Sequence, residues 1–316
     1  MNLEGGYQLV STVYTVEDDV LPFELDENLR FEKASEIQIA DMKESAPMFG
    51  VDLKPYEHEL RKEHQDDPGH YRIFHDPLPA ENHRFLLLTF RGSNYLAYRF
   101  MQLSSALEPP MRFSYLCHTK EAFGLGKGMG WGGLRQFIRP LFRTHEWDVH
   151  FLSKAHLEEV KSAWLGYNNV IRTFPFVEKV ISMIYDLENI PRNHDLYFLG
   201  LFAILELMLT HNPQDRENAD SLNHQISTKV PLLGDRMANK PDYSVFAQGI
   251  AEQKLWKLLY GVRSKIAHGA VTTFDGGDFQ ALRSREVALD FLDQTTRRIA
   301  LHAIREPALF EKLKPI

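Results

Sequence analysis

The sequence predicts a two-domain protein in which an α+β domain is followed by an all-α helical bundle. Its 316 residues are 44% hydrophobic, so the chain is long and apolar enough to bury two cores. Strand and helix patterns alternate in the first half, whereas the helical spacing of apolar residues dominates from residue 151 onward. We therefore expect domains at residues 1–150 and 151–316.

Residues 1–150 combine strand signals with two helices. Three segments rich in β-branched and aromatic residues are predicted as strands: Gln8 to Val16, Phe85 to Phe90 and Phe113 to Leu116. Ser35 and Gln38 form a capping-box pattern that begins a short helix through Glu44. A second helix is predicted over Tyr95 to Leu107, because two prolines follow it. The order of the strands does not follow from these patterns.

A glycine-rich segment follows at residues 124–133, where six of ten residues are glycine. We expect a flexible hinge or a loop facing the substrate. The alternative, a nucleotide-binding loop, lacks a preceding strand and a Gly-Lys-Ser/Thr sequence. Arg135, Arg139 and Arg143 recur every four residues just beyond it, but Pro140 would strain a helix there, so a solvated face is the favoured interpretation.

Helical periodicity predicts five or six helices between residue 151 and the end of the chain. Leu196 to Leu209 is apolar nearly all round, which is typical of a helix enclosed by others. The penultimate long helix has its apolar face at Leu255, Leu258, Leu259, Val262 and Ile266. The last runs from Ser284 to Ile304 and is expected to bury Ala288, Phe291, Leu292, Thr295 and Ile299.

The penultimate helix ends in an Arg-x4-His motif formed by Arg263 and His268. Arginine keeps its charge and histidine titrates near neutral pH, so the pair suits metal-free cleavage of a phosphodiester. The two residues lie roughly 140° apart around an ideal helix and about 7.5 Å apart along its axis. Ser264 lies four residues before His268, on the same face, and Gly269 suits the position that ends a helix. His268 is therefore expected in the last turn, open to solvent.

Charge and cysteine content limit the class of protein. The formal net charge of −7 argues against an indiscriminate nucleic-acid coat protein. Residues 151–316 hold 20 basic and 20 acidic residues, so the first 150 carry the whole excess. The single cysteine, Cys117, excludes an intramolecular disulfide, and we expect it to be a small buried hydrophobic residue. With no evident secretory signal and no apolar run of membrane-spanning length, we expect a cytoplasmic protein without a membrane partner.

The second half resembles the HEPN superfamily of helical ribonuclease domains, and within it the Apea-like branch. The resemblance covers roughly residues 151 to 305. Its motifs are the apolar stretch from Tyr197 with an internal Glu206, the segment Ser221 to Ile226, and the stretch from Tyr260 to Gly269. It implies a helical bundle that dimerises, so that two copies of the motif helix build one composite cleft.

This resemblance also implies residue roles. Arg263 would bind phosphate, His268 would transfer protons, and Ser264 would be the polar residue that often follows the Arg. Four further residues are expected to contact substrate: Lys265, Lys257, Glu206 and Asn223. Glu206 could equally form a structural bond to a neighbouring helix, and Asn223 could serve hydrogen bonding inside the bundle. Some HEPN toxins carry a Tyr two residues beyond the His, which a nucleotidyltransferase modifies. Ala270 stands there, which puts that route of regulation in doubt.

No metal or cofactor is expected. Five histidines lie between residues 58 and 83, but their spacings match no zinc pattern: His58, His64, His70, His75 and His83. The chain has no Gly-x-Ser-x-Gly sequence, and Cys117 and His118 are adjacent rather than arranged as a dyad.

The sequence thus predicts a metal-independent endoribonuclease that cleaves single-stranded RNA as a homodimer. Its family setting is bacterial antiphage defence or a toxin that causes abortive infection. The N-terminal domain would recognise an activating ligand, phage-derived or other, and regulate the nuclease. The alternative is a non-catalytic HEPN module that serves as a dimerisation or RNA-binding scaffold. Both Arg263 and His268 are present, which favours the enzyme.

Overall fold

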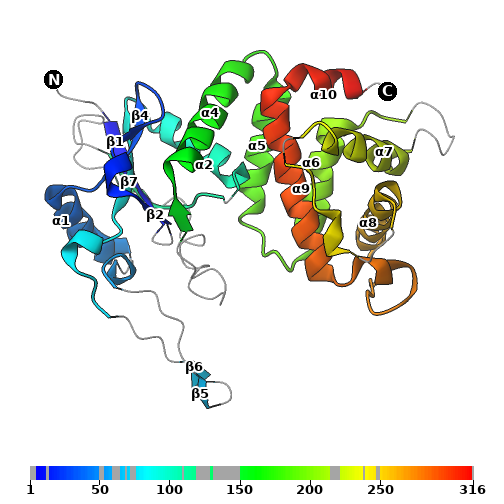
Figure 1. Cartoon of the computed structure of the whole chain (residues 1–316), viewed down its shortest axis with the longest axis horizontal. Coiled ribbons are helices and arrows are strands. Elements are labelled where there is room, and N and C mark those ends of the chain that lie inside the picture. The colour runs from blue at the N-terminus through cyan, green and yellow to red at the C-terminus, as the bar shows by residue number, and fades with distance from the viewer. Residues whose placement is uncertain are drawn as a thin grey trace. The chain divides into compact units, whose positions relative to one another are not determined.

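A small N-terminal sheet region is followed by a mostly helical C-terminal part (Figure 1). The computed structural model describes residues 5–11, 14–49, 53–58, 65–67, 70–71, 76–108, 110–118, 129–130, 150–213, 221–237, 239–246 and 250–314. The chain forms two compact units. The sheet unit comprises Met1–Ser104 and Met111–Leu165, and the helical unit comprises Ser105–Pro110 and Gly166–Ile316.

The chain passes between the two units three times. The passages lie after Ser104, Pro110 and Leu165. The glycine-rich segment 124–133, expected as a hinge, falls within the range of the sheet unit and not at a passage. Apart from the backbone of Met129–Gly130 it lies outside the described residues, as do Arg135, Arg139 and Arg143. We therefore place the connections between the units at these three passages instead.

The sheet unit is built on a six-stranded sheet in the order β3-β4-β7-β1-β8-β9, with every neighbouring pair antiparallel. Its strands are β1 (Gly5–Val10), β3 (Phe23–Glu24), β4 (Leu29–Lys33), β7 (Leu86–Arg91), β8 (Phe113–His118) and β9 (Met129–Gly130). Gly5 lies so close to β7 that a side chain would not fit, because a Cβ atom there would come 2.1 Å from the carbonyl oxygen of Phe90. Every residue of β1 is buried, so both faces of this central strand are covered.

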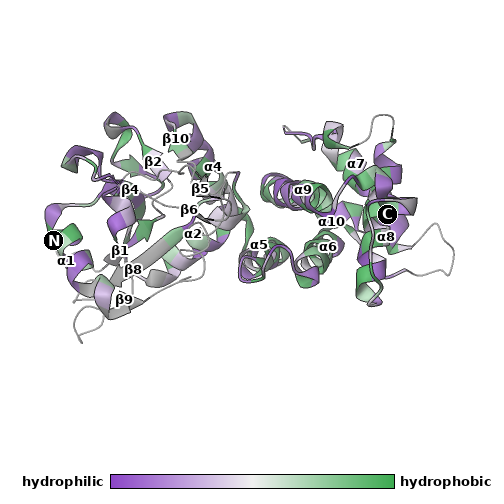
Figure 2. Ribbon diagram, turned by 90° about the horizontal axis from the view of Figure 1, so that it is seen from below, coloured by the Kyte–Doolittle hydropathy of each residue, from purple (hydrophilic) through white to green (hydrophobic). Residues whose placement is uncertain are grey.

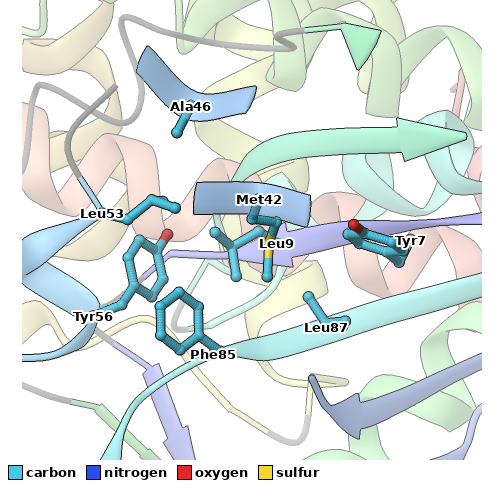
Figure 3. Packing of buried hydrophobic residues seen from close by; sticks show 8 residues of the cluster. All are labelled: Tyr7, Leu9, Met42, Ala46, Leu53, Tyr56, Phe85 and Leu87. Carbon is cyan, nitrogen blue, oxygen red and sulfur yellow. The ribbon is translucent and has the colours of Figure 1, made fainter. Parts of the chain in front are cut away.

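One face of the sheet packs against helix α1 (Glu36–Ser45), which begins with the predicted capping box of Ser35 and Gln38. Figure 3 shows the cluster that fills this face: Tyr7, Leu9, Met42, Ala46, Leu53, Tyr56, Phe85 and Leu87. Tyr56 and Phe85 stack with ring centroids 5.2 Å apart, and the Tyr56 hydroxyl donates to the carbonyl of Val10. The odd-numbered residues Tyr7 and Leu9 of β1 therefore face α1, and the even-numbered residues face the opposite side of the sheet.

The other face packs against α2 (Asn94–Ala106) and the first part of α4 (Lys154–Val170). Phe100 meets Phe31 edge-on at 5.8 Å and Trp164 at 5.4 Å. The indole of Trp164 donates to Asp26 Oδ2 at 2.5 Å, so this buried ring keeps its polar group paired. On the same face, the Gln8 amide donates to the sulfur of Met101.

The expected single strand at residues 8–16 is divided in two. The Ser11 amide donates to the Arg112 carbonyl, and the Tyr14 amide donates to the Ser11 carbonyl at 3.1 Å. The chain resumes as β2 (Tyr14–Val16), which pairs in parallel with β10 (His150–Leu152) in a separate small sheet. A further pair is β5 (Gln65–Asp67) with β6 (His70–Tyr71). Short 3-10 helices are η1 (Asp18–Val20), η2 (Ala46–Phe49), η3 (Lys54–Tyr56) and η4 (Ala80–Asn82).

The helical unit contains α5 (Pro175–Leu187), α6 (Asp195–Leu209), α7 (Leu222–Gly234), α8 (Glu252–Ala267), α9 (Arg285–Arg305) and α10 (Pro307–Leu313). Short 3-10 helices η8 (Tyr243–Val245) and η9 (Gly277–Leu282) flank α8. Helices α5, α6 and α9 lie side by side, and Figure 2 views them nearly along their axes. Gly200 allows the approach of α5, because a Cβ atom there would come 2.3 Å from Leu187 Cδ2. No helix in the described ranges is long and apolar enough to cross a membrane.

A buried ionic network lies inside the helical unit around Arg297 of α9. Its Nη2 contacts Glu188 Oε1 at 2.6 Å, its Nε contacts Asp293 Oδ1 at 3.0 Å, and its Nη1 donates to the carbonyl of Ser105. The Tyr197 hydroxyl donates to Asp293 Oδ1 at 3.0 Å. Burial lowers the pKa of Arg297, but Asp293 and Glu188 outweigh it and raise that pKa well above the usual value. The network thus holds the Ser105–Pro110 segment within the helical unit.

Candidate active site

Helix α8 carries the Arg-x4-His motif, and its buried face explains its position in the unit. The buried residues recur with helical spacing: Leu255, Trp256, Leu259, Val262 and Ile266. Leu258, which was expected in this face, is only half-buried, and Trp256 is fully buried instead. The opposite side exposes Lys254, Lys257, Lys265 and His268.

The helix stops at the motif because Gly269 adopts a left-handed conformation with φ of 71°. The Gly269 amide donates to the Ile266 carbonyl at 3.0 Å, and the Ala270 amide donates to the Lys265 carbonyl at 2.9 Å. This pair of hydrogen bonds is the Schellman arrangement that satisfies the last carbonyls of a helix. His268 is thereby the C-cap residue, and its side chain is exposed, as the sequence predicts.

Arg263 is half-buried and paired with Glu206 of α6. Its Nη2 lies 3.1 Å from Glu206 Oε1 and donates a hydrogen bond to Oε2 at 3.3 Å. The guanidinium carbon lies 5.4 Å from the centroid of the Tyr260 ring, one turn earlier on α8. Of the two sequence interpretations of Glu206, the structure shows a bond to a neighbouring helix, and the partner is the motif arginine.

Helices α6 and α8 run in the same direction where they meet. Phe202 packs edge-on against Tyr260 at 5.6 Å, and about one turn later on each helix Glu206 meets Arg263. Because the residue numbers of these contacts rise together on both helices, the two helices are parallel. The packing of Phe202 on Tyr260 therefore sets Glu206 beside Arg263. Burial and the nearby charge of Glu206 raise the pKa of Tyr260, against an opposing effect of Arg263. Tyr260 is a site residue that spacing alone could have indicated, since it lies three residues before Arg263.

The remaining motif residues are not drawn into this cluster. Within the described part of the chain, the His268 side chain forms no hydrogen bond and no ion pair, and nothing links it to Arg263. Ser264 lies one turn before His268, and its backbone carbonyl accepts the His268 amide at 3.1 Å, as helix geometry requires. One chain therefore presents Arg263 and His268 as separate groups.

The other expected substrate contacts are distributed around α8. The Lys265 ammonium lies 4.6 Å from the ring centroid of Phe279 in η9. Lys257 is exposed on α8. Asn223 lies in the first turn of α7, after the cap residue Ser221, and its Oδ1 atom is buried without a hydrogen-bond partner among the described residues. Lys257 and Lys265 are therefore both exposed cations, and Lys265 also packs over an aromatic ring.

The histidines between residues 58 and 83 form no recognisable site in the part that is described. His58 Nδ1 lies 2.9 Å from the Lys54 carbonyl, and His83 Nε2 lies 3.2 Å from the Leu78 carbonyl. The side chains of His64, His70 and His75 lie outside the described residues. Among the residues that are described, no group of three or more potential ligands could hold a metal ion.

Comparisons with known proteins do not identify the chain. No protein-family model matches it, and neither a curated protein nor a solved structure matches it either.

Proposed function

We propose that this protein is a metal-independent endoribonuclease of the HEPN type that cleaves single-stranded RNA. The observation that carries the proposal is the end of α8, where a half-buried, oriented Arg263 is followed by a solvent-exposed His268. A phosphodiester needs a fixed cation and a group that exchanges protons with solvent, and these two side chains supply both. The resemblance of residues 151–305 to HEPN domains supports the same reaction.

The chemistry assigns one step to each group. The ribose 2′-oxygen loses its proton and attacks the adjacent phosphorus, while the bond from phosphorus to the 5′-oxygen breaks and that oxygen gains a proton. The products are a 2′,3′-cyclic phosphate and a 5′-hydroxyl. His268 exchanges the protons, and Arg263 stabilises the charge of the phosphorane. Lys257 and Lys265 are exposed lysines of α8 that can contact the RNA backbone.

A homodimer completes the acid–base pair. One chain supplies a single motif histidine, whereas the reaction removes one proton and delivers another. The surface that follows His268 is open in the single chain, and the Val271 side chain is 87% exposed there. We propose that two copies of α8 meet about a twofold axis, so that the single composite cleft contains two histidines and two arginines.

The decisive experiment is an assay of purified protein on single-stranded RNA in the presence of EDTA. We expect cleavage with 2′,3′-cyclic phosphate ends, and a roughly 10²- to 10⁴-fold loss of rate in His268→Ala. Arg263→Ala should lose activity similarly. Arg236→Ala is the matched control, since it removes an exposed arginine that pairs with Glu306 on the surface. Full activity in either motif variant, or loss of cleavage with EDTA, contradicts the mechanism.

Mixing wild-type and His268→Ala chains tests the dimer. Activity should fall by more than dilution, because mixed dimers lack one histidine. Strict proportionality to the wild-type fraction, together with a monomeric mass in solution scattering, contradicts the shared cleft.

The second candidate is a non-catalytic RNA-binding or dimerisation scaffold. It is favoured by the ion pair with Glu206, which neutralises Arg263, and by the lack of a contact between Arg263 and His268 in one chain. A scaffold would bind single-stranded RNA and leave it intact at all protein concentrations, so the same assay separates the two.

We further propose that the sheet unit regulates the nuclease in response to an activating ligand, in a bacterial defence or toxin system. Expression of the full chain should then arrest growth only when the activator is present, and His268→Ala should abolish the arrest. Arrest that persists in His268→Ala contradicts the assignment.

A further inference from the structure

The ion pair between Arg263 and Glu206 uses one nitrogen of the guanidinium. Both carboxylate oxygens are approached by Nη2, at 3.1 and 3.3 Å, instead of by two nitrogens in a fork. Within the described ranges, Nε is buried without an acceptor and Nη1 has none. The Arg263 side chain is 29% exposed, so part of it is accessible to a second anion.

Glu206 is itself held firmly enough to orient its partner. Its side chain is only 19% exposed, and its charge raises the pKa of Tyr260 on α8, which lies close to it. Phe202, one turn earlier on α6, packs edge-on against the Tyr260 ring. The carboxylate therefore fixes the guanidinium in one orientation, which removes part of the entropic cost of binding in a productive geometry.

The same carboxylate cancels the charge that a phosphate would meet. Arg263 and Glu206 sum to zero, so a phosphate on the open edge is attracted by the guanidinium and repelled by the carboxylate behind it. At a separation on the order of 7 Å and an effective dielectric constant of about 20 to 40, that repulsion corresponds to roughly tenfold or more in affinity. Glu206 thus has opposite effects on binding and on orientation.

Building on the proposed function, we propose that Glu206 is a positioning residue that lowers the affinity of the site for RNA while raising the rate of cleavage. It holds Arg263 in the orientation that the phosphorane requires, and it weakens ground-state binding of the phosphate. Interactions that favour the transition state over the bound substrate are the ones that accelerate a reaction.

The test is Glu206→Gln, which keeps the shape and a hydrogen-bond acceptor but removes the charge. Asp195→Asn is the matched control, because it removes one negative charge from the same helix and also breaks an arginine pair, with Arg285 at 2.7 Å. Asp195 lies about 16 Å from Glu206 along the axis of α6. Tyr260→Phe is the second variant, since it removes the hydroxyl near Glu206 without changing the charge.

Affinity is measured first, by fluorescence anisotropy with a labelled single-stranded DNA oligonucleotide, which lacks the 2′-hydroxyl and is not cleaved. Glu206→Gln should bind about tenfold more tightly than wild type. Asp195→Asn and Tyr260→Phe should bind like wild type, and Arg263→Ala should bind more weakly. This arm needs no ribonuclease activity.

Single-turnover cleavage of a labelled RNA is the second readout. Glu206→Gln should cleave roughly 10- to 100-fold more slowly at saturation despite its tighter binding, with Tyr260→Phe intermediate and Asp195→Asn unchanged. A wild-type protein that cleaves no RNA refutes the proposed function, while the binding arm still decides the electrostatic half of the inference. Glu206→Gln that binds no more tightly than Asp195→Asn, or that cleaves as fast as wild type, overturns the inference. Reduced stability with unchanged affinity would show a structural ion pair only.

Discussion

Replacing Arg297 with methionine should lower the unfolding free energy by about 3–5 kcal/mol, whereas the same change at Arg298 should cost about 1 kcal/mol or less. The two arginines are adjacent on α9, and both bind the Ser105–Pro110 segment. They differ in burial. The Arg297 side chain is 6% exposed, whereas Arg298 and its partner Glu108 are 23% and 28% exposed.

The magnitude follows from what each change leaves behind. Arg297→Met removes the guanidinium from Glu188 and Asp293, two carboxylates that are each 11% exposed. Asp293 keeps Arg192 at 3.2 Å, so the lost compensation falls mainly on the buried charge of Glu188. Arg298→Met breaks a two-point contact with Glu108 at 2.9 and 3.0 Å, but water reaches both groups and screens the loss. Methionine keeps most of the apolar stem in both cases.

The assay is urea unfolding followed by far-ultraviolet circular dichroism, which reports mainly the helical unit. Arg297→Met should also lower the melting temperature by on the order of 10 °C. Adding Glu188→Gln to Arg297→Met should recover part of the loss, because one buried charge is then removed. The reasoning is refuted if Arg298→Met is as destabilising as Arg297→Met, or if the double variant is less stable than the single one.

Two further outcomes are expected. Gly269→Ala should cost about 1 kcal/mol because alanine disfavours a φ of 71°, whereas Gly276→Ala, with extended backbone and open space around it, should be neutral; equal denaturation midpoints would contradict this. Burial lowers the pKa of His302 in the folded state, against an opposing effect of Glu306, so the unfolded state binds more protons below pH 6.5. Wild type should therefore lose stability as the pH falls from 7 to 5, and His302→Gln should lose less. The change in denaturant midpoint between the two pH values measures this. An equal change in wild type and His302→Gln would disprove the contribution of His302.

Local structure in this chain was predictable wherever one signal decides it. The capping box at Ser35, the apolar helix α6 and the glycine that ends α8 all follow from neighbouring residues, and the structure confirms them. The cap of α9 at Ser284 and the burial of Thr295 agree as well. Helix α10 was not predicted, because its short apolar pattern is too brief to give a period.

Long-range pairing could not be predicted. Glu206 and Arg263 were each singled out in the sequence, but only the packing of α6 against α8 shows that they are partners. Arginine is usually found on protein surfaces. The burial of Arg297 depends on Glu188 and on the carbonyl of Ser105, which lie far away in the chain. Periodicity describes one element at a time, whereas such contacts depend on how elements meet.

The three passages of the chain between its units constrain how the protein can be divided. A fragment beginning near residue 150 would contain α5 to α10 but would lack Ser105 and Glu108, which bind Arg297 and Arg298. Any separation of the helical unit from the sheet unit must therefore carry the Ser105–Pro110 peptide along, for instance as a circular permutant or as two co-expressed pieces. In an exchange of modules between related proteins, this short peptide would have to travel with the helices although its neighbours in the chain belong to the sheet.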